Sequence, residues 1–152
     1  MLSPTRRGAR LARLLATTQL GEWGVASRVE AAAHIVAELA VNALTHGRVR
    51  GRDFRLGLGV YGDGAVLRIE VTDARGECLP PEPGRTHVPD ADRESGRGLL
   101  IVEAMADRWG ISTGPAPCKT VWAELDLAPS TGPALTTGLS WGRASGHGGM
   151  RE

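Results

Sequence analysis

The chain has 152 residues and a mass of 16.0 kDa, a size that fits one domain and allows a hydrophobic core. Its 18 basic and 17 acidic side chains leave a formal net charge of +1, which indicates neither a disordered acidic chain nor a strongly basic nucleic-acid-binding surface. Arginine, glycine or acidic residues interrupt every hydrophobic segment before it reaches the roughly 18 residues of a membrane span. No membrane-spanning helix is therefore expected.

Cysteine usage indicates a reducing compartment. Cys78 and Cys118 are far apart in the sequence and form neither a CxxC motif nor a Cys/His cluster with zinc spacing. We therefore expect a cytoplasmic protein. The first 20 residues are rich in arginine and contain no acid, a composition that transit peptides share. Because Lys119 is the sole lysine, a general preference for arginine explains this start better.

Hydrophobic periodicity predicts a first helix over residues 11–20 and a second that begins near Ser27. Ser27 with Glu30 three residues later is the capping-box pattern of a helix start. The second helix is expected to run to about His46, where Gly47 ends it. Its apolar residues lie almost all round the helix, which indicates burial on more than one side.

Two strands at 54–61 and 66–72 flank an Asp-Gly turn and predict an antiparallel hairpin. A third helix is expected from Gly96-Arg97-Gly98 to near Trp109-Gly110, followed by short strands at 111–113 and 120–127. This order of elements favours an α+β sandwich over a doubly wound parallel sheet. The expected organisation is an N-terminal segment at 1–9, a domain at 10–127 and a flexible tail rich in Gly, Ser, Thr and Pro at 128–152.

Polar residues recur on one face of the second predicted helix. Glu38, Asn42 and His46 stand at i, i+4 and i+8, so that a helix places all three side by side. Polar groups on an otherwise apolar helix need partners, which a pocket lined with water supplies. An exposed polar stripe explains the same spacing equally well.

Two further sites carry a weaker signal. Gly96-x-Gly98 opens a helix, where free backbone N–H groups attract an anion such as phosphate. Neither the dinucleotide-binding motif nor the P-loop motif supports a phosphate site here, because Ile101 stands in place of the third Rossmann glycine and no GK[ST] follows. Asp73 ends a strand, where its carboxylate can accept a hydrogen bond from an exocyclic amine, although aspartate is also common in turns.

The order and spacing of these segments resemble a known family over about residues 10–127. The segments are Glu38-Leu39-x-x-Asn42-Ala43 with His46-Gly47, then Asp73, Gly96-x-Gly98-Leu99 and Lys119-Thr120-Val121-Trp122. Together they resemble the ATP-binding domain of the gyrase, histidine-kinase and MutL type, and most closely the anti-sigma-factor serine kinases common in actinobacteria. The resemblance implies the Bergerat fold, a two-layer sandwich whose mixed, mainly antiparallel sheet is covered on one face by helices.

The resemblance also implies a role for each matching residue. Asn42 would bind the Mg²⁺ of ATP, and Glu38 would act as general base. His46 would either shape the phosphate side or be a buried structural histidine. The remaining implied contacts to ATP are Asp73 with the adenine amine, Gly76 beside the ring, Gly96, Arg97, Gly98 and Leu99 around the phosphates, and Thr120 on the adenine side through water. Residues 77–95 would form the ATP lid, which explains a long loop in a small domain.

The sequence departs from the family pattern after Asp73. The usual Asp-x-Gly-x-Gly is here Asp73-Ala74-Arg75-Gly76-Glu77, with Arg75 and Glu77 at the two glycine positions. Arg75 would then either crowd the base or contact the nucleotide. The strand expected before the first helix is short or missing.

The resemblance implies an ATP-dependent serine/threonine protein kinase that regulates transcription. Its implied partners are a sigma factor and an anti-anti-sigma antagonist that it phosphorylates, with no direct contact to nucleic acid or membrane and with a homodimer as a further expectation. Two alternatives stay open: a module that binds ATP and a partner without phosphotransfer, and a fold used only for protein contact.

Overall fold

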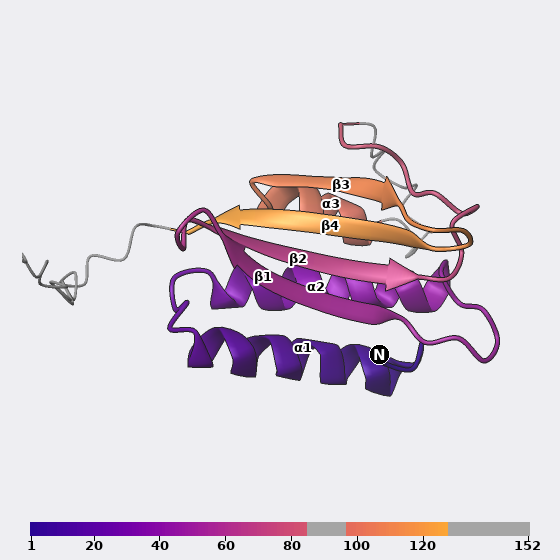
Figure 1. The fold of residues 1–152 in the computed structure, drawn as a ribbon, viewed down its shortest axis with the longest axis horizontal. Coiled ribbons are helices and arrows are strands. Elements are labelled where there is room, and N and C mark those ends of the chain that lie inside the picture. Colours follow the sequence, from indigo (N-terminus) through magenta and orange to yellow (C-terminus); the bar gives the residue numbers. More distant parts are fainter. Residues whose placement is uncertain (85–96, 128–152) are drawn as a thin grey trace, which may run out of the picture.

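The computed structural model describes residues 1–84 and 97–127 (Figure 1). Gly96, residues 85–95 of the predicted lid and the predicted tail at 128–152 lie outside the described residues. In chain order the elements are α1 (Arg6–Glu22), α2 (Val29–Thr45), β1 (Arg55–Tyr61), β2 (Val66–Asp73), α3 (Arg97–Met105), β3 (Arg108–Thr113) and β4 (Lys119–Asp126).

The four strands form one sheet in the order β1-β2-β4-β3, and every neighbouring pair is antiparallel. The helices lie together on one side of this sheet (Figure 1). α2 is central, because it packs against α1, α3, β2 and β4. The structure confirms the predicted α+β sandwich and the β1–β2 hairpin.

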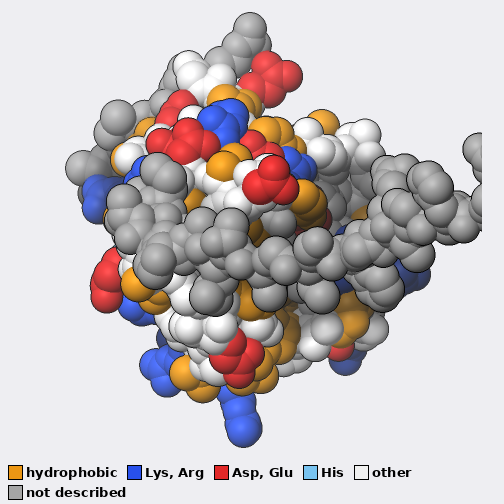
Figure 2. Space-filling model, turned by 60° about the vertical axis from the view of Figure 1, so that its left-hand side comes forward, with side chains coloured by type: hydrophobic (Ala, Val, Ile, Leu, Met, Phe, Trp, Pro, Cys, Tyr) orange, Lys and Arg blue, Asp and Glu red, His pale blue; other side chains and the backbone are white. Residues whose placement is uncertain are grey.

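Alternating hydrophobic residues explain why the sheet packs on one face. In β2 and β4 every second residue is buried, and the hydrophobic ones among them pack with α2 in a single core. The apolar residues of α2 are buried on several sides, as its composition predicts. On the face shown in Figure 2, basic and acidic side chains are interspersed with hydrophobic ones, in keeping with the small net charge. None of the helices in the described parts of the chain has the length and hydrophobicity needed to cross a bilayer.

The first two helices begin at residues other than those that the sequence pattern predicts. α1 begins at Arg6, five residues before the predicted start at 11, and the Thr5 hydroxyl caps it by accepting a hydrogen bond from the Gly8 N–H at 3.1 Å. α2 begins at Val29, and its N-cap is Arg28 rather than Ser27, with no side-chain capping hydrogen bond. The capping-box prediction at Ser27 is therefore wrong.

The third helix is shorter than predicted. α3 ends at Met105, and Trp109-Gly110, its predicted end, lies inside β3. Trp109 is opposite Ala123 of β4 and is buried with 7% of its surface exposed. Because these residues pair with β4 and the indole is buried, β3 begins at Arg108 and not at its predicted start, Ile111.

Candidate functional site

A pocket of about 310 Å³ opens between α2, the adjacent ends of β2 and β4, and the start of α3. This volume falls within the range of small-molecule sites, roughly 300–1,000 Å³. Most of its lining is apolar, and the polar side chains come from α2, β2 and β4. The lining residues are Leu39, Asn42, Ala43, His46, Val71, Asp73, Cys78, Leu79, Pro80, Pro81, Leu99, Lys119 and Val121.

Asp73 is the last residue of β2 and is fixed in place on several sides. Its Oδ1 accepts hydrogen bonds from the Arg75 backbone N–H at 2.9 Å and from Lys119 Nζ at 2.8 Å. Lys119 also donates to the Arg75 carbonyl at 2.7 Å. Gly47 lies so close that a Cβ there would overlap the Asp73 carboxyl group. The carboxylate is therefore held in one orientation at the pocket wall.

The polar face of α2 meets the start of α3. Asn42 and His46 line the pocket, and Glu38 lies one turn before Asn42. A Cβ on Gly98 would lie 2.7 Å from Glu38 Oε2 and 3.5 Å from Asn42 Oδ1. Glycine at position 98 therefore lets the backbone of α3 approach both side chains.

In the described part of the chain, Asn42 and Glu38 lack the hydrogen-bond partners that polar groups on a packed helix usually have. Asn42 Nδ2 is buried and has no hydrogen-bond partner among the described residues. The structure shows no hydrogen bond or ion pair for Glu38 within residues 1–84 and 97–127. His46 is exposed at the C-cap of α2, so it is not a buried structural histidine. An exposed polar stripe does not describe this face, because Asn42 is part of a pocket.

The other predicted phosphate-side residues lie at the start of α3. Arg97 is exposed there, and Leu99 is buried and lines the pocket. Cys78, Leu79, Pro80 and Pro81, from the described part of the predicted lid, also line the pocket.

Gly76 and Thr120 do not line the pocket. The Gly76 N–H donates to the Pro117 carbonyl at 2.6 Å, and a Cβ on Gly76 would lie 2.8 Å from the same oxygen. Glycine here lets the loop after β2 pack on the connection between β3 and β4. The hydroxyl of Thr120 is 2.8 Å from that of Thr72 on the opposite strand, on the side of the sheet away from the pocket.

Arg75 and Glu77, which replace two glycines of the family pattern, pair with each other outside the pocket. Arg75 Nε donates to Glu77 Oε1 at 3.1 Å. A hydrogen bond from its own backbone and the one from Arg75 lower the pKa of Glu77. Neither side chain lines the pocket, so Arg75 does not crowd it.

Sequence reasoning missed Lys119 as a pocket residue. The alternation that places Val121, Ala123 and Leu125 on the buried face of β4 also places Lys119 there, two residues before Val121. That alternation was the signal that could have identified it.

Comparison with known proteins agrees with the geometry. No curated protein matches the chain. Residues 2–125 match the family described as Histidine kinase-like ATPase domain. This span contains all the described helices and strands, except for the last residue of β4. The pocket, with its carboxylate at the end of β2 and its polar helix face beside the start of α3, lies entirely within this match. The chain belongs to the histidine kinase-like ATPase domain family.

Proposed function

We propose that this chain is an ATP-binding regulatory protein that acts as a serine/threonine protein kinase, in the manner of the anti-sigma-factor kinases that its sequence resembles. One observation carries the proposal: Glu38 and Asn42 lie together against Gly98 at the start of α3, beside a pocket that holds the Asp73 carboxylate. The candidate phosphate-binding start of α3, the candidate general base Glu38 and the candidate adenine-binding carboxylate of Asp73 thus adjoin one cavity.

Asn42 fits the role of a Mg²⁺ ligand. In the described ranges, no group of three or more His, Cys, Asp or Glu side chains could hold a metal ion by itself. Mg²⁺ needs no such cage, because it keeps several waters and is bound by one or two protein groups together with phosphates. Oxygen Oδ1 of Asn42, the atom that would bind Mg²⁺, accepts no hydrogen bond from the described residues, and the buried Nδ2 of the same amide also lacks a partner among them. When bound, Mg²⁺ would offset the negative charge of the phosphates.

Glu38 fits the role of general base. Its carboxylate has no protein partner in the described structure and lies beside Gly98, where the acceptor group would meet the phosphates. There it would hold the proton that the serine hydroxyl loses during transfer. The first backbone N–H groups of α3, which have no partner within the helix, would stabilise charge on the phosphoryl oxygens.

The proposed protein partners are a sigma factor and an anti-anti-sigma antagonist, with the antagonist as the phosphorylated substrate and a homodimer as the assembly. The sequence resemblance supports these partners.

The test combines ATP titration with a phosphotransfer assay. We expect ATP to bind with Mg²⁺ in the micromolar to millimolar range, roughly −8 to −4 kcal/mol by calorimetry. Transfer of labelled phosphate to anti-anti-sigma proteins of the same organism would establish the kinase. In Glu38→Gln, ATP binding should persist and transfer should be lost.

The outcomes separate the alternatives. ATP binding without transfer in wild type and in Glu38→Gln would support an ATP-dependent binding module. No ATP binding at millimolar concentration would contradict the ATP site and leave a protein-contact scaffold.

A further inference from the structure

The pocket contains a buried ion pair that the proposed catalytic roles do not use. Lys119 is the sole lysine of the chain, and only 3% of its surface is exposed. Its ammonium group is paired with Asp73 at 2.8 Å, and both residues line the pocket. Removing two charges from water is costly, and apolar residues of similar volume often give equal or greater stability than a buried pair. Stability alone therefore explains this pair poorly.

The donors and acceptors of the pair are not all occupied. A lysine ammonium has three N–H donors. Two go to Asp73 Oδ1 and to the Arg75 carbonyl, which leaves one without a partner in the described structure. Asp73 receives both of its hydrogen bonds on Oδ1, so Oδ2 has none among the described residues. Within residues 1–84 and 97–127, the pair thus keeps one unused donor and one unused acceptor.

Such a pair matches a specific feature of a purine. The adenine edge carries an amine, which donates, beside ring nitrogen N1, which accepts. Asp73 Oδ2 can accept a hydrogen bond from the amine, and the third N–H of Lys119 can donate one to N1. Because Lys119 is held by two other hydrogen bonds, this donor is already oriented before the base arrives.

We propose that Lys119 is a base-reading residue that donates a hydrogen bond directly to ring nitrogen N1 of the base whose amine Asp73 accepts. This inference rests on the proposed function, since it requires the pocket to take the adenine of ATP. It assigns Lys119 a role in specificity beyond that of keeping Asp73 in place.

The test compares ATP with 1-deaza-ATP, in which a C–H group replaces N1. Their dissociation constants are measured by calorimetry with the wild-type protein and with Lys119→Met. The wild type should bind 1-deaza-ATP roughly ten-fold or more weakly than ATP, because a hydrogen bond from a charged donor is lost. In Lys119→Met the two ligands should bind equally. Each comparison gives the ratio of two dissociation constants on the same protein. A general loss of nucleotide affinity in the variant therefore does not change this ratio.

A conservative variant and a neutral pair serve as controls. Lys119→Arg keeps a charged donor and should retain discrimination between the two ligands. Lys119→Met leaves the Asp73 carboxylate buried without its partner, and circular dichroism would show whether it folds. If it does not fold, Asp73→Asn/Lys119→Met removes both charges, and there too the preference for ATP over 1-deaza-ATP should disappear.

Three results would overturn the inference. Equal binding of both ligands by the wild type would show that N1 is not read. An unchanged preference in the variants that lack Lys119 would show that another group reads it. Failure of the wild type to bind either ligand at millimolar concentration would overturn the proposed function and this inference together, so the two failures are distinguishable.

Discussion

Gly47 and Gly98 place backbone against the two carboxylates of the site. Gly47 adjoins the carboxyl group of Asp73, and Gly98 adjoins that of Glu38. In each case a methyl group would occupy space that the acidic side chain now fills. The site therefore depends on the absence of a side chain at these two positions as much as on the carboxylates themselves.

Gly47→Ala tests this dependence at Asp73. We expect a loss of roughly 1–3 kcal/mol in the free energy of unfolding, because the new methyl overpacks a buried ion pair. Nucleotide affinity should fall as well, since Asp73 must move. Urea unfolding and ATP titration measure the two effects. Gly21→Ala is the matched control, because a Cβ there meets nothing within 4 Å, and alanine is favoured in a helix. Equal stability of the two variants would contradict the argument.

Asn42→Leu separates function from stability at a single residue. The buried Nδ2 lacks a partner, and an unsatisfied polar group costs about 1–3 kcal/mol. A leucine of similar shape should therefore leave the protein as stable as wild type or more stable, while ATP binding that depends on Mg²⁺ is abolished. Thermal unfolding and calorimetry with and without Mg²⁺ provide the measurement. A marked loss of stability would show that the amide has a structural role.

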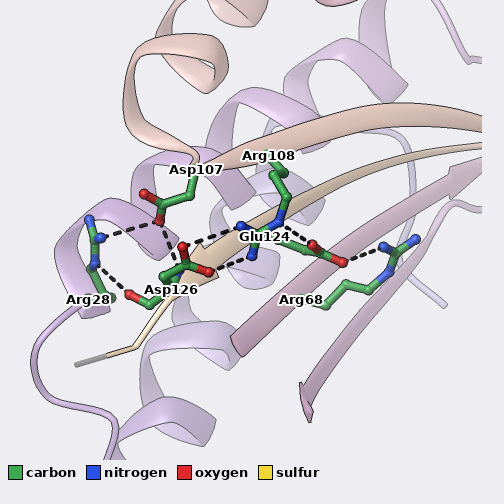
Figure 3. Close-up of polar contacts among 6 residues, drawn as sticks. All are labelled: Arg28, Arg68, Asp107, Arg108, Glu124 and Asp126. Carbon is green, nitrogen blue, oxygen red and sulfur yellow. Dashed lines mark hydrogen bonds and ion pairs between the residues drawn. The ribbon is translucent and has the colours of Figure 1, made fainter. Parts of the chain in front are cut away.

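At the scale of elements, a network of charged side chains connects the sheet with the start of α2 (Figure 3). Arg108 binds Glu124 and Asp126 of the neighbouring strand, and Arg68 of β2 binds Glu124 from the other side at 2.7 Å. Asp107 joins the network to the N-cap of α2 by accepting hydrogen bonds from Arg28 at 3.2 Å and from the Asp126 N–H at 2.8 Å. The network holds together strands that are distant in the sequence.

The network predicts a loss of stability in acid. Hydrogen bonds from Arg108, and then from Arg68, lower the pKa of Glu124, and the hydrogen bond from Arg108 lowers that of Asp126. A carboxylate with a lowered folded pKa stabilises the fold above its unfolded pKa, about 4.3 for Glu, and loses this contribution as the pH falls through the folded value. Wild type should therefore exceed Glu124→Gln in stability at about pH 7, and the difference should shrink below about pH 4.

Urea unfolding of both proteins across this pH range provides the measurement. Because most of these groups are partly exposed, added salt should also reduce the difference. A difference that does not change with pH would show that the network does not contribute through its charge.

At the scale of the whole molecule, the core extends almost from one end of the described chain to the other. The buried hydrophobic residues of the described ranges fall between Ala9 and Leu125. Before them, Leu2 pairs with Phe54 in an isolated antiparallel bridge, and Thr5 caps α1. The first residues are thus part of the fold, although the expected domain start was residue 10.

Two truncations test these boundaries. A chain of residues 1–127 should unfold at the same temperature as the full chain, because it retains the described core. A chain of residues 10–127 should be less stable, since it loses the Leu2–Phe54 bridge and the cap, which alone is worth about 1 kcal/mol. Calorimetry of the three chains measures the transitions. A lower unfolding temperature for residues 1–127, or an unchanged one for residues 10–127, would contradict these boundaries.

Local sequence patterns are sufficient to show which faces of the strands and helices are buried and in what order these elements follow. Alternation in β2 and β4 is a local property, because successive side chains point to opposite faces of a strand. Residues four apart lie on the same face of any α-helix, so the sequence alone places Glu38 and Asn42 together on α2. Their association with Gly98 followed from the family resemblance rather than from a local pattern.

Contacts that depend on pairing between distant segments are visible in the folded structure and not in local sequence patterns. The antiparallel register of β2 and β4 sets Lys119 opposite Asp73, 46 residues earlier, and points Thr120 away from the pocket. Pairing with β4 likewise places Trp109 in β3, where a helical pattern had predicted the end of a helix. Local periodicity cannot contain this information, because strand register is a property of two segments brought together by the fold.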